Sequence, residues 1–306
     1  APIPGFGRDG FIAGLLLSSP PAIYRDVLIT QSLSSEVKAW DIGTGAPRWT
    51  LQLKAQPDDP NVATWLNDSW KTSSGPGLWG LFTVDVERGL LFVPVEKVGN
   101  DYYGGPTPGN NLYSNSVLAV DALTGKIKWH QQLVHHDIWD YDVAAQPALV
   151  DVQRNGRTIP GVAQMTKAGL LFVFNRETGE PMYGWEERPV PQTTAKGEWT
   201  SPTQPFPLKP PPLARNALKK EELARVTPEL EAYCKRLWET YSLQDTVPYN
   251  PWKEGQDIVV FPGAIGGGNW QGVAFNKPLG LIITNVMNAG QWGHLQEGGG
   301  RGGRGA

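Results

Sequence analysis

The sequence predicts an all-β fold assembled from repeated short units. The main observation is an eleven-residue pattern that occurs three times: an apolar residue, an Asp or Asn two positions later, a Thr-Gly pair, and an aromatic residue at the end. The copies are AWDIGTGAPRW at 39–49, AVDALTGKIKW at 119–129 and VFNRETGEPMY at 173–183. The composition agrees, because 36 glycines and 27 prolines in 306 residues suit a chain with many turns.

Each copy predicts a strand, a tight hairpin turn and a second strand. Asp or Asn followed by Thr-Gly is typical of a turn in which glycine adopts a positive φ. Asp41 and Asp121 are 80 residues apart, and weaker copies surround Asp85 and Asn276. Two units of about 40 residues, each with a strand–turn–strand core, indicate four-stranded propeller blades. The alternative is an ordinary β-sandwich with chance similarity between turns, which three copies of so long a pattern disfavour.

The blade hypothesis also predicts how the units pack. We expect antiparallel strand pairing, with the side chains of Trp49 and Trp129 packed between neighbouring blades. One region departs from the repeat: a tract rich in Pro, Thr and Ser is followed by apolar residues at helical spacing over 221–241. We therefore assign residues 1–306 to one propeller domain with an insertion at about 189–255. The expected apolar face of the helix is Leu223, Leu230, Tyr233, Leu237 and Trp238, with Asn216 or Thr227 as the N-cap.

Charge, hydropathy and cysteine content exclude several classes of protein. A net charge of −3 argues against nucleic-acid binding. The apolar run at 11–17 is shorter than the roughly 20 residues that span a bilayer. A single cysteine, Cys234, excludes an internal disulfide, a CxxC zinc site and CxxCH haem attachment, and we interpret it as a packed thiol. The GGGRGGRG tract at 298–305 predicts a flexible tail.

The densest group of reactive side chains is VHHDIWDYD at 134–142, directly after the second repeat. A metal site would use His135, His136 and Asp137, although neighbouring side chains on an extended segment point apart. A second interpretation makes one Asp a proton acceptor. A third is a polar loop whose Asp side chains accept hydrogen bonds from backbone N–H groups. Composition alone favours the third.

Three further positions are candidates for ligand contact. Lys167 stands just before an apolar strand, where it could donate to an anionic or carbonyl oxygen or be an ordinary solvated lysine. Trp79 lies between glycines in GPGLWG, and Asn269 and Trp270 lie in GGGNWQG. Glycine lets a flat ligand approach an aromatic face, so the two sites suggest a stacking platform, although such tryptophans usually belong to a core.

Longer segments identify a family resemblance. WHQQLVHHDIWDYDVAAQPALVD at 129–151, TKAGLLFVFNRETGEP at 166–181 and FPGAIGGGNWQG at 261–272 resemble the pyrroloquinoline-quinone (PQQ)-dependent dehydrogenases, or quinoproteins. They are most similar to the membrane glucose dehydrogenase-like branch. The resemblance implies an eight-bladed propeller of which this chain is a fragment, about half.

The resemblance also implies roles for individual residues. Asp140 matches the catalytic base and Lys167 the residue that contacts the quinone oxygen. Trp79 matches the tryptophan beneath the quinone, and Asn269 and Trp270 match cofactor contacts of a later blade. In relatives that oxidise alcohols, a Glu and an Asn bind calcium beside the quinone. Here the Asn position holds Lys97 and the Glu has no clear counterpart, which leaves Asp140 and Glu96 as candidates for binding a divalent cation, expected to be Ca²⁺.

The resemblance implies oxidation of a glucose-like sugar or an alcohol, with hydride transfer to PQQ and Asp140 as general base. Electrons would pass to ubiquinone or a cytochrome, because the chain has no haem motif. The expected location is the periplasm, with membrane association through a segment outside this chain. The alternative is a non-catalytic propeller that serves as a scaffold for protein assembly.

Overall fold

Antiparallel sheets dominate the computed structural model, which describes residues 4–13, 17–32 and 35–296. The first sheet has the order β1-β2-β3-β4 and the second the order β5-β6-β7-β8. Both therefore run in chain order, as strands joined by hairpins do. The first sheet consists of β1 (Ala22–Tyr24), β2 (Val27–Ser32), β3 (Glu36–Asp41) and β4 (Pro47–Gln52), and the second of β5 (Thr83–Asp85), β6 (Leu90–Pro94), β7 (Ser116–Asp121) and β8 (Ile127–Gln132).

The third sheet is shorter, and smaller pairs follow it. Its order is β11-β10-β9, and an isolated bridge from Phe174 to Pro181 continues it. Each pairing between named strands is antiparallel, as the sequence predicts. The remaining strands are β9 (Ala148–Arg154), β10 (Arg157–Met165), β11 (Leu171–Asn175), the pair β12 (Trp185–Pro189) and β13 (Thr203–Pro207), the pair β14 (Ile258–Val260) and β17 (Gln291–Gly293), and the pair β15 (Ala274–Asn276) and β16 (Leu281–Ile283).

The sheets pack face to face and share their cores. Alternate residues of β6 point to opposite faces, as in any strand. Leu91 and Val93 join the core cluster that contains β2 and β3 residues, whereas Leu90 and Phe92 join the cluster that contains Trp129 and β11 residues. The second sheet is therefore buried on both faces, between the first and the third. This is the packing expected of successive blades.

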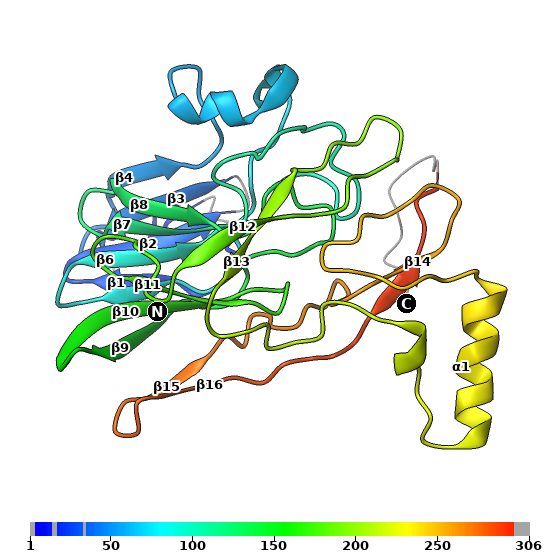
Figure 1. Ribbon diagram of the computed structural model, residues 1–306. Helices are drawn as coiled ribbons and strands as arrows, with labels where there is room; N and C mark the ends of the chain where they lie inside the picture. The colour runs from blue at the N-terminus through cyan, green and yellow to red at the C-terminus, as the bar shows by residue number, and fades with distance from the viewer. Residues whose placement is uncertain (1–3, 14–16, 33–34, 297–306) are drawn as a thin grey trace.

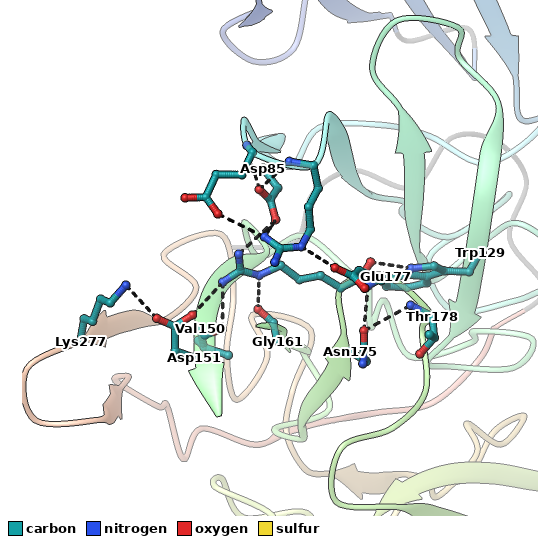
Figure 2. Close-up of polar contacts among 12 residues, drawn as sticks. Asp85, Trp129, Val150, Asp151, Gly161, Asn175, Glu177, Thr178 and Lys277 are labelled. Carbon is teal, nitrogen blue, oxygen red and sulfur yellow. Dashed lines mark hydrogen bonds and ion pairs between the residues drawn. The ribbon is translucent and has the colours of Figure 1, made fainter. Parts of the chain in front are cut away.

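The tryptophan that ends each of the first two repeats packs on the turn of the next sheet, whereas Tyr183, which ends the third, is exposed. A Cβ at Gly125 would lie 2.5 Å from the Trp49 ring, and a Cβ at Gly179 would lie 2.6 Å from the Trp129 ring. The indole Nε1 of Trp129 donates to the carbonyl oxygen of Arg176 at 2.8 Å, as Figure 2 shows beside the turn. The Thr-Gly pair of the repeat thus provides the space that the preceding tryptophan fills. The prediction that Trp49 and Trp129 pack between units is confirmed.

The N-terminal segment uses the same kind of contact. Phe6 lies against Gly45, the turn glycine of the first repeat, and Gly7 N donates to Thr44 O at 2.7 Å. Asp side chains order these turns, because Asp121 Oδ1 accepts from the backbone N–H of Leu123 and Thr124. Such local bonds explain why the repeat requires Asp or Asn at that position.

A buried arginine connects the second and third sheets (Figure 2). Arg176 donates from Nη1 to Asp85 Oδ2 at 3.1 Å and from Nη2 to Val150 O at 2.9 Å. Lys277, in the β15–β16 turn, pairs with Asp151 of β9 at 2.9 Å. These contacts link the second sheet, the third sheet and the β15–β16 pair.

Residues 189–255, the predicted insertion, contain the single α-helix of the described residues. Helix α1 (Pro228–Thr240) packs beside β14, away from the four-stranded sheets (Figure 1). Thr227 caps it by accepting from Leu230 N at 3.2 Å, so the Asn216 alternative was wrong. The helix is shorter than the predicted 221–241, because Pro228 sits at its first turn and residues Lys220–Glu222 form a separate 3-10 turn, η3.

The apolar face of α1 is narrower than predicted. Trp238 is buried, whereas Leu230 and Tyr233 are exposed and Leu223 lies outside the helix. None of the helices described is long and apolar enough to cross a membrane. The predicted flexible tail at 298–305 lies outside the described residues.

Candidate active site

Three loops that connect strands bring an acid and a lysine together. Asp140 lies between β8 and β9, and Lys167 lies in the turn between β10 and β11. Lys167 Nζ donates to Asp140 Oδ2 at 2.9 Å and to Asp142 Oδ2 at 3.1 Å. Lys167 and Asp142 are buried, and Asp140 is partly exposed. The structure therefore places the two predicted catalytic residues in direct contact.

The loop that carries Asp140 is held in an unusual conformation. Asp140 has a φ of +62°, which non-glycine residues rarely adopt, so its surroundings must fix it. The aromatic residues on either side provide this support: Trp139 Nε1 donates to Asn250 O at 2.8 Å, and the Tyr141 hydroxyl donates to Pro262 O at 2.6 Å. With both neighbours buried and bonded, the Asp140 carboxyl is the part of the loop left toward solvent.

Electrostatics set Asp140 apart from an ordinary aspartate. Burial and the Asp142 carboxylate raise the pKa of Asp140 to about 7, although the Lys167 ammonium group lowers it. Burial by itself would lower the pKa of Lys167, but the carboxylates of Asp142 and Asp140 outweigh that effect and raise it. Lys167 is therefore cationic at neutral pH, whereas Asp140 can exchange a proton near neutrality. A carboxyl group with such a pKa suits general base catalysis.

Glu96 adds a third acidic group from the loop between β6 and β7. Burial raises the pKa of Glu96 to about 8, and the Asp142 carboxylate adds to the rise. Gly77 lies directly against it, since a Cβ there would overlap the Glu96 carboxyl group. Next to it, Lys97 is buried, and its Nζ donates to the carbonyl oxygens of residues 98–100. Lys97 Nζ also lies 3.8 Å from Asp101 Oδ1, and its charge lowers the pKa of Glu96.

The neighbouring histidines do not form a metal site. His135 contacts Gln132 and Glu187, whereas His136 contacts Gly109 O and Glu198. Asp137 instead accepts from Trp139 N at 2.8 Å, as the polar-loop interpretation predicts. The side chains diverge because the loop bends between them, with a φ of +44° at His136. Within the part of the chain that the structure describes, no three His, Cys, Asp or Glu side chains gather where they could hold a metal ion.

The residues predicted to contact the cofactor lie on loops around Lys167 and Glu96, and they differ in how far they are exposed to solvent. The loop at 263–272 packs on Lys167, because Gly267 N donates to Lys167 O at 2.7 Å and a Cβ at Gly266 would lie 2.7 Å from Lys167 Cβ. Asn269, in that loop, donates to Ile265 O and accepts from Trp270 N. The Trp270 side chain is 65% exposed, and Trp79 is half-buried two residues after Gly77. The loops that carry Trp79 and Trp270 thus border the group formed by Glu96 and Lys167.

Sequence reasoning did not single out Asp142. Its Oδ1 accepts from Lys97 N at 3.0 Å while its Oδ2 accepts from Lys167, so it joins two of the three loops. A signal was present, because Asp142 follows Asp140 by two residues in the same cluster of acidic side chains. Asn115 was also missed: it is fully buried and donates from Nδ2 to Asp137 Oδ2 at 2.9 Å and to Tyr141 O at 3.1 Å.

Face-to-face sheets with tryptophans docked on successive turns define a β-propeller-type protein, and its loops carry a buried acid–lysine pair. The chain belongs to the family described as PQQ, "Glucose/ethanol/alcohol dehydrogenase, beta-propeller domain", which matches residues 8–302. The family resemblance found in the sequence is therefore confirmed.

Sequence relatives agree with this assignment. The chain is 33% identical over 261 residues to the quinate/shikimate dehydrogenase (quinone) of Acinetobacter baylyi, covering 84% of this chain and 31% of that protein. It is 32% identical over 284 residues to the quinoprotein glucose dehydrogenase of Escherichia coli, covering 88% of this chain and 34% of that protein. The chain thus spans about a third of the length of these relatives. The scaffold alternative receives no support from them.

Solved structures share the fold. A europium-containing methanol dehydrogenase superposes with a TM-score of 0.61 at 20% identity, over 87% of this chain and 43% of that one. The quinohemoprotein alcohol dehydrogenase of Comamonas testosteroni superposes with a TM-score of 0.60 at 21% identity, over 88% of this chain and 37% of that one.

Proposed function

We propose that the protein to which this chain belongs is a PQQ-dependent dehydrogenase that oxidises a CH–OH group of a glucose-like sugar or an alcohol. The observation that carries the proposal is the contact of 2.9 Å between Nζ of the buried Lys167 and Oδ2 of the partly exposed Asp140. A carboxyl group with a pKa near neutrality beside a fixed cation is what proton removal from a hydroxyl requires. Family membership and the named relatives support the same activity.

The residues around this contact fit PQQ. A quinone with acidic substituents needs a hydrogen-bond donor or cation near its oxygens, which Lys167 provides. A planar ring also needs backbone that lies close. The glycines at 266–268 have no side chain, so their loop packs directly on Lys167 and Met165. We assign Lys167 to the quinone oxygen and Trp79 to the ring face. We also assign Asn269 and Trp270 to contacts with the cofactor at the edge of the site.

The mechanism follows from what each side chain can do. When bound, PQQ supplies the acceptor for the hydride that leaves the substrate carbon. Asp140 accepts the hydroxyl proton, and its position next to Lys167 keeps a fraction of it ionised at neutral pH. Lys167, kept cationic by Asp142, donates a hydrogen bond where negative charge develops, which is the logic of a preorganised oxyanion site.

A divalent cation, Ca²⁺ in our proposal, fits the chemistry of the donor groups. Asp140 and Glu96 carry carboxylate oxygens, the ligands that Ca²⁺ prefers. Burial and the nearby Asp142 carboxylate raise the pKa of both Asp140 and Glu96, so a bound cation would favour their ionised forms. Asp140 and Glu96 are the ligands we assign. Lys97, which replaces the family's Asn ligand, donates to backbone oxygens, and its charge lowers the pKa of Glu96.

The wider context is part of the same proposal. We propose an eight-bladed propeller of which this chain forms about half, with an insertion at 189–255, because the chain spans about a third of its relatives. We further propose a periplasmic protein, attached to the membrane through a segment outside this chain, that delivers electrons to ubiquinone or a cytochrome. The family resemblance supports these assignments, and fractionation of cells that express the full-length gene tests the location. Recovery in the cytosol alone would contradict it.

Reconstitution tests the activity. The full-length protein is incubated with PQQ and Ca²⁺, and dye reduction is measured with glucose, quinate and simple alcohols. We expect turnover that depends on PQQ. No turnover with any of these substrates, despite bound PQQ, would contradict the proposal.

A further inference from the structure

Helix α1 leaves part of its apolar face uncovered. Leu230 is 38% and Tyr233 51% exposed, and Leu237, one turn further on, is partly buried. Spacings of three and four residues place these side chains along one side of a helix. We call Leu230, Tyr233 and Leu237 the outer stripe. Exposed apolar surface that is grouped in this way is typical of interaction sites.

The outer stripe sits on a firmly anchored helix. Trp238 is buried in a cluster with Leu243 and Val259, which fixes the C-terminal half of α1 beside β14. The Thr227 side chain caps the other end of the helix. Figure 1 shows α1 at the edge of the described chain. A rigid element of this kind loses little entropy when it binds a partner.

Two charged side chains of α1 form no ion pair with any described residue. The helix has five charged residues. Glu231 pairs with Lys235 at 2.8 Å, and Glu239 pairs with a lysine that precedes the helix at 3.8 Å. The remaining two are Glu229 and Arg236, and both are exposed.

These two charges flank the outer stripe. Glu229 directly precedes Leu230, and Arg236 directly precedes Leu237. They are seven residues apart, about two turns, so they lie on the same side of the helix. The Arg236 guanidinium group lies over the Tyr233 ring, 6.0 Å from its centroid. In packed helix pairs, charges at such flanking positions face the partner helix and set its orientation.

We propose that the outer stripe pairs with the outer stripe of a second copy of the chain, in an antiparallel helix pair with twofold symmetry. In such an interface each contact occurs twice, so Glu229 of either copy meets Arg236 of the other. The same symmetry places Leu230 of each copy against Tyr233 of the other. The apolar contacts and both ion pairs therefore form together.

The charges select the antiparallel orientation. In a parallel pair, residues of the same number lie at the same level, so Glu229 would lie near Glu229 and Arg236 near Arg236. No opposite charges would meet. One helix pair is also smaller than a standard interface of about 1,200–2,000 Å², so the dimer is weak and depends on concentration. The proposal involves neither Asp140 nor Lys167 and does not rest on the proposed activity.

Sedimentation velocity of the full-length protein over a range of concentrations tests the proposal. We expect a monomer–dimer equilibrium. Glu229→Arg and Arg236→Glu each set two pairs of like charges against one another, and each should weaken association about tenfold. An equimolar mixture of these two variants restores both opposite-charge pairs and should associate about as well as the wild type.

Matched controls carry the same changes on the opposite side of α1. Glu239→Arg and Lys235→Glu should leave the dimer intact. Tyr233→Ser removes an apolar contact at a half-exposed position and should abolish association. Circular dichroism of each variant checks that the protein is folded.

Several outcomes would overturn the proposal. A dimer that neither charge reversal weakens would use another surface, and reversals that weaken the dimer without recovery on mixing would exclude the antiparallel pairing. A monomer at every concentration would also contradict it. Flotation of that monomer with phosphatidylglycerol vesicles, lost in Tyr233→Ser, would assign the outer stripe to a lipid surface. A monomer that does not float would mean that the rest of the full-length chain covers the stripe.

Discussion

Lys167 Nζ lies 3.1 Å from Asp142 Oδ2 while it also contacts Asp140, so one cation is shared between two carboxylates. Asp142 is the better buried of the two and is anchored by Lys97 N. Burial and the Asp142 carboxylate keep the pKa of Asp140 near neutrality, even though the shared ammonium group lowers it. Asp142 thus contributes to the proposed chemistry without needing to touch the substrate.

The first prediction concerns Asp140 as the base. Asp140→Asn in the full-length protein should lower turnover by about 10²- to 10⁴-fold, the usual contribution of a general base, while PQQ still binds. Turnover is measured by dye reduction and PQQ content by absorbance. Asp58→Asn, at an exposed aspartate, is the matched control and should be neutral. Unchanged turnover in Asp140→Asn would remove this residue from the mechanism.

The second prediction is a pH dependence. Because the base must be ionised, turnover should rise as pH increases through about 7, the pKa of Asp140. Lys167 lowers that pKa, so Lys167→Gln should move the rise to higher pH as well as slow the reaction. A pH–rate profile of both proteins measures this. A rise at the same pH in Lys167→Gln would show that another group controls the profile.

The third prediction links Glu96 to stability. The pKa of Glu96 is raised from 4.5 to about 8 in the folded protein. Between these two pH values, Glu96 is protonated in the folded state but ionised in the unfolded state. The stabilisation is complete below pH 4.5 and disappears as pH rises toward about 8. Urea midpoints of the PQQ-free protein should fall over that interval, and less so in Glu96→Gln. Glu87→Gln, whose side chain is 81% exposed, should behave like wild type.

The fourth prediction concerns the docked tryptophans. Gly179 and Gly156 both have positive φ values, 75° and 72°, but only Gly179 lies against a ring. Gly156→Ala should cost about 1–2 kcal/mol, the price of the backbone conformation. Gly179→Ala should cost about 1–3 kcal/mol more, because its Cβ would displace Trp129. Chemical unfolding measures both, and equal costs would contradict the docking role.

Much of the fold could be predicted from the sequence because short segments of the chain determine it. Asp or Asn, Thr-Gly and the aromatic residue specify a turn and its docking partner within eleven residues, so the repeat revealed the blades. The helix was located but its start was misjudged. Capping depends on one Thr-Pro pair, Thr227 and Pro228, and apolar spacing extended the predicted helix into η3.

For the candidate site, the sequence alone determined which residue types were present, and the family resemblance singled out Asp140 and Lys167. Only the tertiary structure decided that Asp142 shares Lys167, that Lys97 turns its ammonium group to backbone oxygens, and that His135 and His136 point to different partners. These facts depend on where loops from different sheets meet and on which atoms are left unpaired there. No local pattern encodes that, because it results from the packing of residues far apart in the chain.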